Sequence, residues 1–218
     1  MPPVRIPGRA AGQPALEAVL TPAANGSEWV AVVLHPHPKL GGELSNNVVV
    51  SAARGLHSRL GFAALRVNTR GVGGSEGWST WRGVDEREDV LSALAYARTV
   101  AKRVLLVAYS FGAAVGLSAV ALHRESALVD AVACVGYPKG FLARFLFFSH
   151  YAHVDPGPGV PKLFLLGDAD EFTAVGTMRD VFAGVSEPKE LRIVQGDHFM
   201  FGREQVLVDP LVEWASRL

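Results

Sequence analysis

The feature that most constrains the fold is an alternation between short apolar runs and longer segments with a helical pattern. The apolar runs are mostly aliphatic, without the polar alternation of a half-exposed strand, and they occupy residues 29–34, 63–67, 103–108, 130–135 and 162–166. Such runs are typical of strands buried on both faces of a sheet. A further strand is expected at residues 191–194, before a glycine-containing loop.

Helical patterns fill the intervals between these runs. The clearest covers residues 85–100, where apolar residues recur at three- and four-residue spacing opposite an acidic first turn. Other helix-like segments cover the residues around His57 and residues 111–123, 174–185 and 204–218. The alternation predicts an α/β three-layer sandwich, in which a mostly parallel central sheet carries helices on both faces.

The N-terminal residues depart from this alternation. Two short extended pieces, residues 4–6 and 15–20, are separated by prolines and glycines. They predict an antiparallel hairpin at one edge of the sheet. No linker divides the rest of the chain, so we expect a single domain over residues 1–218 with a short insertion at about 137–161.

Composition and charge exclude several classes of function. The 21 basic and 21 acidic residues cancel, so no long-range field would attract nucleic acid or an anionic membrane. No stretch approaches the roughly 18 apolar residues of a membrane span, and prolines and arginines occupy the place of a secretory signal. Cys134 lies in an apolar run, which predicts a buried, inert thiol. We expect a cytoplasmic protein that acts on a small molecule; the sequence indicates no oligomeric state.

A serine stands where one apolar run meets a helical pattern. Ser110 has Ala108 and Gly112 two positions away on either side, and the segment after it is rich in small residues. A nucleophile elbow requires this context, because its sharp turn brings the helix so close to the strand that only small side chains fit. The turn would aim the N–H of Phe111 at an oxyanion. The alternative interpretation of Ser110 is an ordinary helix N-cap.

The segment around Ser110 and three further segments resemble the α/β-hydrolase superfamily. The resemblance covers roughly residues 29–218. The segment HPHPKLGG, residues 35–42, is similar to the loop that holds the superfamily's other oxyanion-hole N–H. Because proline has no N–H, the resemblance implies His37 as that donor. The segment NTRGVGGSEG, residues 68–77, resembles a loop of small hydrolases with a short lid or none. Ala108 departs by one methyl group from the glycine that is usual before the nucleophile.

The fourth segment supplies the acid and the base. The superfamily places its acid three residues after a strand-terminal glycine, which implies Asp170, with Asp168 and Glu171 as competitors. A glycine-containing loop after the last strand ends in His198, in agreement with the chain order Ser, Asp, His. Because ligand sites of open parallel sheets lie at the carboxyl ends of the strands, a carboxylate there can approach Ser110.

The resemblance implies a serine hydrolase without metal or other cofactor. His198 would take the proton of Ser110, Asp170 would orient the imidazolium, and water would hydrolyse the acyl-enzyme. A dinucleotide site is disfavoured, because the third glycine of G-x-G-x-x-G is replaced by Glu76. A metal site is disfavoured because no HExxH helix or paired-cysteine spacing occurs.

The insertion bears on the substrate. It is rich in aromatic residues at one end and in proline and glycine at the other, and it is either a surface helix packed on the core or a short lid. The expected substrate contacts are His35, Tyr109, Phe141 and Phe145. A small ester, cleaved as by a carboxylesterase, is favoured. The same residues acting on thioester, C–C or peptide bonds, or a non-catalytic binding or scaffold protein, are the alternatives.

Overall fold

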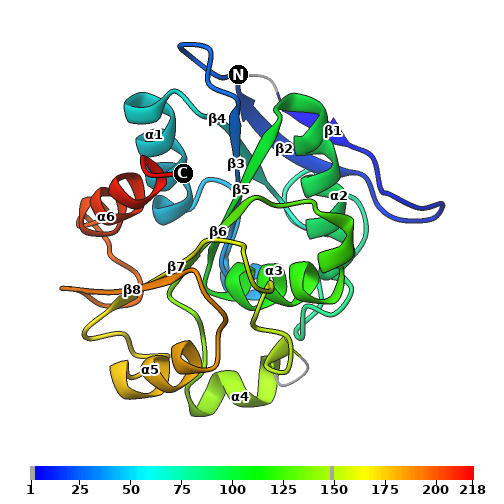
Figure 1. Ribbon diagram of the computed structural model, residues 1–218. Coiled ribbons are helices and arrows are strands. Elements are labelled where there is room, and N and C mark those ends of the chain that lie inside the picture. Colours follow the sequence, from blue (N-terminus) through cyan, green and yellow to red (C-terminus); the bar gives the residue numbers. More distant parts are fainter. Residues whose placement is uncertain (1–2, 148–149) are drawn as a thin grey trace.

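In the computed structural model, which describes residues 3–147 and 150–218, the chain forms one eight-stranded sheet with helices on both faces (Figure 1). The strands are β1 (Val4–Ile6), β2 (Leu16–Thr21), β3 (Trp29–Leu34), β4 (Ala63–Val67), β5 (Arg103–Tyr109), β6 (Ala131–Val135), β7 (Lys162–Gly167) and β8 (Lys189–Val194). The helices are α1 (Asn47–Leu60), α2 (Glu86–Val100), α3 (Phe111–Leu122), α4 (Phe141–Phe147), α5 (Val175–Ala183) and α6 (Gln205–Ala215), with 3-10 turns at Pro38–Leu40 and Arg124–Ser126.

The sheet is mostly parallel, as predicted. Its strand order is β1-β2-β4-β3-β5-β6-β7-β8. β1 and β2 pair antiparallel, with Ile6 opposite Leu16, and β2 pairs antiparallel with β4, whereas the other neighbours are parallel. The N-terminal hairpin at the sheet edge is therefore confirmed. β8 begins two residues earlier than the expected strand.

Two apolar cores explain why the central strands lack polar residues. Along β3, Val30 and Val32 pack into one core with α2 and α3, while Ala31 and Val33 pack into the other with α1 and α6. Figure 1 shows α1 and α6 on one side of the sheet and α2 and α3 on the other. Both faces of these strands are thus removed from water, and Cys134 lies in the first core, buried as expected.

The helix around His57 is delimited by its two ends. Asn46 caps α1 with its side-chain Oδ1, which accepts a hydrogen bond from the N–H of Val48 at 3.0 Å. Gly61 ends the helix in the left-handed conformation at φ 74°. No helix in the described part of the chain has the length and apolar character needed to cross a membrane.

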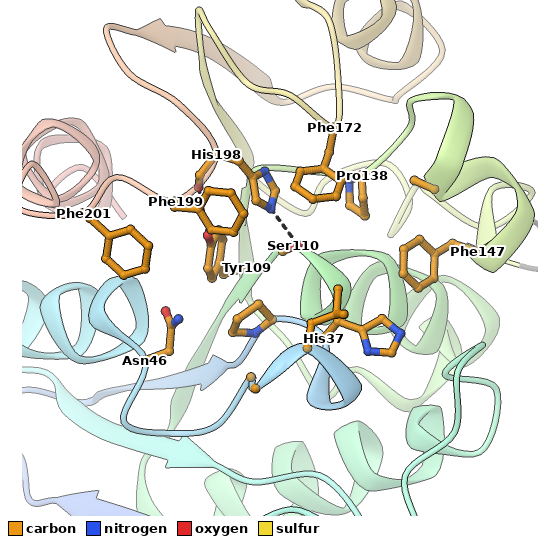
Figure 2. A pocket seen from close by; sticks show the side chains of 15 residues that line it. His37, Asn46, Tyr109, Ser110, Pro138, Phe147, Phe172, His198, Phe199 and Phe201 are labelled. Atoms are coloured by element: carbon orange, nitrogen blue, oxygen red, sulfur yellow. Dashed lines mark hydrogen bonds between the residues drawn. The ribbon is translucent and has the colours of Figure 1, made fainter.

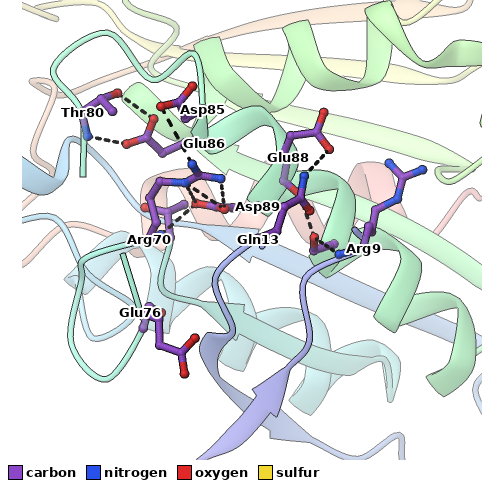
Figure 3. Close-up of polar contacts among 12 residues, drawn as sticks. Arg9, Gln13, Arg70, Glu76, Thr80, Asp85, Glu86, Glu88 and Asp89 are labelled. Carbon is purple, nitrogen blue, oxygen red and sulfur yellow. Dashed lines mark hydrogen bonds and ion pairs between the residues drawn. The ribbon is translucent and has the colours of Figure 1, made fainter. Parts of the chain in front are cut away.

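Two acidic residues in the first turn of α2, Glu86 and Asp89, are buried. Asp89, 3% exposed, accepts hydrogen bonds from the backbone N–H of Arg70 at 2.8 Å and from its guanidinium at 2.8 to 3.1 Å (Figure 3). Glu86 accepts hydrogen bonds from the N–H and hydroxyl of Thr80. These contacts fasten the loop after β4 to α2, so the glycine-rich segment 68–77 is anchored by ion pairing at its arginine.

Candidate active site

Ser110 occupies a sharp turn between β5 and α3. Its backbone has φ 55° and ψ −118°, a conformation that non-glycine residues rarely adopt. The N–H of Ser110 donates to the carbonyl of Val135 at 2.9 Å, and its own carbonyl accepts from the N–H of Ala113 at 2.9 Å. The neighbouring strand and the first turn of α3 therefore hold the strained residue from both sides.

Close packing of α3 on the sheet explains the small residues around Ser110. A Cβ at Gly112 would lie 2.7 Å from the carbonyl oxygen of His35, so this position requires glycine. The methyl group of Ala108, which replaces the usual glycine, lies near Gly116 of α3: a Cβ added at Gly116 would lie 3.4 Å from it, an ordinary contact distance, and nearer to the side chains of Leu34 and Leu106, at 3.2 and 3.3 Å. Gly116 therefore leaves room mainly for these two leucines, and the extra methyl group of Ala108 is accommodated without a close contact.

Three side chains from the carboxyl ends of different strands form a chain of hydrogen bonds. The hydroxyl of Ser110 donates to His198 Nε2 at 2.9 Å, and His198 Nδ1–H donates to Asp170 Oδ2 at 2.7 Å. The other oxygen of Asp170 accepts from the N–H groups of Phe172 and Thr173, both at 2.9 Å. The Asp170 and His198 side chains are almost fully buried, so this geometry is shielded from water.

The two competing carboxylates bind the backbone of the histidine loop instead of the imidazole. Asp168 accepts from the N–H of Gly196 at 2.9 Å, and Glu171 accepts from the N–H of His198 at 3.0 Å. Tyr109 holds the same loop from the other side, since its hydroxyl donates to the carbonyl of His198 at 2.8 Å. The structure thus gives the predicted acid, Asp170, a contact with the imidazole that neither competitor makes.

The expected oxyanion donors are free to bind a ligand. Among the described residues, the backbone N–H groups of His37 and Phe111 donate no hydrogen bond. The imidazole of His37 is engaged at both nitrogens: Nδ1 accepts from the N–H of Lys39, and Nε2–H donates to the carbonyl of Trp81, both at 3.1 Å. Burial lowers the pKa of His37, so the ring is neutral and acts as a support for its own loop.

His35 lies behind this loop and does not line the pocket. Its Nδ1–H donates to the carbonyl of Pro36 at 2.6 Å, and its Nε2 accepts from the N–H of Thr69 at 3.1 Å. Complete burial lowers the pKa of His35 to about 4. His35, expected as a substrate contact, is thus absent from the pocket lining and forms a neutral link between the ends of β3 and β4.

The serine opens into an apolar pocket of about 310 Å³. Figure 2 shows rings from four separate segments around it. The aromatic lining residues are Tyr109, Phe147, Phe172, Phe199 and Phe201. Phe172 lies against the His198 imidazole, with ring centroids 4.5 Å apart, and Phe199 contacts both. The pocket is therefore built largely by side chains that adjoin the predicted acid and base.

The insertion contributes a different helix face from the one expected. Ala143 and Phe147 of α4 line the pocket. Phe141 and Phe145 are instead 82% and 66% exposed, and their ring centroids lie 5.4 Å apart. Of the residues expected to contact substrate, Phe141 and Phe145 do not line this pocket, whereas Tyr109 does. Residues 148 and 149 of the insertion lie outside the described residues.

Several pocket residues escaped sequence reasoning. Phe172, Phe199 and Phe201 directly follow the predicted acid and base, and this proximity to Asp170 and His198 was the available signal. Asn46 also lines the pocket, from the N-terminus of α1. Nothing in the sequence around Asn46 distinguishes a pocket residue from the helix cap that it also is.

Comparison with known proteins agrees with this geometry. Residues 18–217 match the model of the alpha/beta hydrolase family. An uncharacterized protein of Rickettsia prowazekii is 30% identical over 193 residues, which cover 84% of this chain and 77% of that protein.

Solved structures extend the similarity to nearly the whole chain. An alpha-beta serine hydrolase homologue from Coxiella burnetii is 28% identical, with a TM-score of 0.80 over 97% of this chain and 96% of that one. A serine hydrolase without lid from Xanthomonas campestris is 25% identical, with a TM-score of 0.82 over 99% of this chain and 94% of that one. The matches confirm the fold expected from the sequence, with a short insertion in place of a large cap.

Proposed function

Because the chain belongs to the alpha/beta hydrolase family, we propose that it is a serine hydrolase that cleaves small esters through an acyl-enzyme intermediate. The observation that carries this proposal is the hydrogen-bonded chain from Ser110 through His198 to Asp170, with the serine open to an apolar pocket. A hydroxyl with a positioned base, and a base with a positioned carboxylate, together form an activated nucleophile.

In the first half of the reaction, His198 Nε2 accepts the proton of Ser110 while Oγ attacks the ester carbonyl. Asp170 keeps Nδ1–H of the imidazole in place and stabilises the imidazolium that forms. The tetrahedral intermediate expels the alcohol, which takes the proton from His198. Water then attacks the acyl-enzyme and gives a proton to the same nitrogen. The second tetrahedral intermediate expels the Ser110 oxygen, which takes this proton back from His198, and the acid is released.

The negative oxygen of each tetrahedral intermediate needs hydrogen-bond donors. The free N–H groups of His37 and Phe111 support this role, and the N-terminus of the twelve-residue helix α3 adds a favourable dipole. The loop that carries His37 is tight, because a Cβ at Gly42 would lie only 2.1 Å from the carbonyl oxygen of Pro36. A rigid loop keeps its donor oriented before the charge develops.

The size and lining of the pocket support a small, largely apolar substrate. About 310 Å³ is at the lower end of the range for small-molecule sites. The walls are mainly aromatic and aliphatic, and the short helix α4 covers one side without forming a large cap. A short acyl chain or a small alcohol group fills such a space, while a long acyl chain would extend into water.

A series of p-nitrophenyl esters from acetate to palmitate tests the proposal. We expect kcat/KM to peak at short acyl chains, and Ser110→Ala to remain folded with hydrolysis reduced to the background rate. A maximum at long chains would exclude the small-ester assignment. Full turnover by Ser110→Ala would show that Ser110 is not the nucleophile, and preference for a matched thioester or peptide would move the reaction to that class.

A further inference from the structure

We propose that Asn46 determines substrate specificity, and that the preferred ester carries a hydrogen-bond acceptor, such as an ether or carbonyl oxygen, at a distance from the scissile bond. This inference rests on the proposed function, because it describes the substrate of the same site. It arises from the polar groups of the pocket, which are few, and from their hydrogen-bond partners.

The pocket extends to two sides of Ser110. Figure 2 shows Phe147 on one side and Phe199, Phe201 and Asn46 on the other. On the side of Phe147 and Ala143, the described side chains are apolar except for the His37 imidazole, whose two nitrogens already bind backbone atoms. The side that contains Asn46, which we call the amide side, combines two aromatic rings with one amide group, so the two sides of an ester would meet different chemistry.

Almost every polar side chain in the pocket lining is already occupied. The Tyr109 hydroxyl donates to the carbonyl of His198, and both ring nitrogens of His37 bind backbone atoms. Ser110 and His198 bind each other. Of the described residues that line the pocket, Asn46 alone keeps an unused side-chain donor, its Nδ2–H₂ group.

The orientation of this donor is fixed by the cap of α1. Asn46 Oδ1 accepts from the N–H of Val48, which makes the opposite end of the amide the donor end. Figure 2 shows the Asn46 amide group pointing toward Phe201 and the interior of the pocket. A substrate oxygen on the amide side can therefore accept a hydrogen bond without displacing any interaction within the protein.

The amide side is also preformed. Asn47 Nδ2 donates to the carbonyl of Phe199 at 3.0 Å and to Glu204 at 2.8 Å, which ties the segment after His198 to α1. The rings of Phe199 and Phe201 stack with centroids 5.9 Å apart and an interplanar angle of 8°. Although the Phe199 and Phe201 side chains are 42% and 72% exposed, the Asn47 contacts hold the backbone of this segment, which lowers the cost of ordering it around a ligand oxygen.

The proposal is tested with pairs of esters that are identical except that an ether oxygen in one replaces a CH₂ group in the other. One pair varies the acyl part, p-nitrophenyl pentanoate against p-nitrophenyl 3-methoxypropanoate. The other varies the alcohol part, butyl butyrate against 2-methoxyethyl butyrate. The measured quantity is the ratio of kcat/KM for the ether to that for the alkyl ester. Comparison of this ratio between variants removes the intrinsic reactivity of each ester.

The variants are Asn46→Asp and Asn46→Ala. Aspartate keeps an oxygen that caps α1 but has no donor, whereas alanine removes both, so only Asn46→Ala should lower the melting temperature. We expect both variants to lower the ether-to-alkyl ratio by about 3- to 10-fold in one of the two pairs, as for loss of one hydrogen bond. The larger loss is expected for Asn46→Asp, since its carboxylate repels the substrate oxygen.

Two outcomes would overturn the proposal in distinguishable ways. An unchanged ratio in both pairs, with hydrolysis of all four esters intact, would refute the role of Asn46 and leave the proposed function standing. Failure of the parent protein to hydrolyse any of the esters would refute the small-ester function, and the role of Asn46 with it.

Discussion

Three carboxylates after β7 lie close together in the chain, yet each binds a different group. Asp168 accepts from Gly196, Glu171 accepts from the backbone of His198, and Asp170 accepts from the imidazole itself. Only the last contact can orient the ring and stabilise its charge. At the residue scale, the candidate site therefore depends on which carboxylate accepts the hydrogen bond from Nδ1–H of His198.

Exchange of each carboxylate for its amide tests this division of roles. We expect Asp170→Asn to lower kcat by about 10³- to 10⁴-fold, because the amide no longer holds the imidazole in the right tautomer. The fold should persist, since Oδ1 of asparagine can still accept from Phe172 and Thr173. Kinetics with a short-chain ester and a thermal melt measure the two effects.

Asp168→Asn and Glu171→Gln are the matched controls, because each amide keeps an oxygen that can accept the same backbone hydrogen bond. Both should retain kcat within about tenfold of the parent, a change of about 1.4 kcal/mol or less in the barrier. A greater loss of kcat in either control than in Asp170→Asn would show that Asp170 is not the acid that supports His198.

The sequence predicted the positions of Ser110, Asp170 and His198 but not the walls around them. The resemblance to the superfamily indicated these residues, because it implies an acid three residues after the strand-terminal glycine and a histidine in the loop after the last strand. It does not indicate which face of α4 lines the pocket, because every residue of this helix except Arg144 is apolar. Phe141 and Phe145 were therefore expected in the pocket in place of Ala143 and Phe147.

At the scale of elements, the elbow depends on how closely α3 approaches the sheet. Gly112 allows the contact with β3, and Gly116 leaves room for the side chains of Leu34 of β3 and Leu106 of β5. The strands were predictable because both of their faces are buried, which demands continuous apolar runs. The packing of Gly116 on these two leucines was not predictable, since it depends on the register of a helix against two strands.

A double-mutant cycle tests this packing. Gly116→Ala would place a methyl group 3.2 Å from Leu34 and 3.3 Å from Leu106, nearer than its 3.4 Å to Ala108, so its cost should be nearly the same in the parent and in the Ala108→Gly background. We expect a coupling free energy below about 0.5 kcal/mol in urea unfolding. Ala108→Gly alone should cost about 0.5–1 kcal/mol through added backbone entropy. A coupling free energy above about 1 kcal/mol would show that Ala108 and Gly116 share a tight contact.

At the scale of the whole molecule, buried neutral histidines link stability to pH. Burial lowers the pKa of His35 and of His150 from the usual 6.5 to about 4. Between these values the unfolded chain binds protons that the folded protein does not, so stability is present above about pH 6.5 and is lost as pH falls toward 4. Between these pH values, each histidine lowers the free energy of unfolding by up to about 1.4 kcal/mol for each unit by which the pH falls.

Urea unfolding at pH 7, 6 and 5 tests this expectation. The unfolding free energy should fall with decreasing pH, and His150→Gln should reduce the slope. Burial raises the pKa of Glu86 and gives a contribution of opposite sign. Because Glu86 is present in both proteins, an equal pH dependence of the unfolding free energy in the parent and in His150→Gln would contradict neutral burial of His150.

The sheet order brings distant parts of the chain together at one edge. Ser110 follows β5, Asp170 follows β7 and His198 follows β8, and these strands lie side by side with β6 between the first two. The carboxyl ends of parallel strands share this edge, which agrees with the convergence that the resemblance to the superfamily implied for these three residues. The amide side of the pocket was not predictable, because it combines the start of α1 with the segment after His198, and these are far apart in the sequence.

We propose that Ser110 is a nucleophile activated by His198. Labelling with a fluorophosphonate probe, which reacts with activated serines, tests this proposal directly. Peptide mapping by mass spectrometry should find a single adduct on Ser110 of the parent protein, no adduct in Ser110→Ala, and little or none in His198→Ala under the same conditions. A folded parent that takes up no probe, or an adduct that survives in Ser110→Ala, would contradict the account.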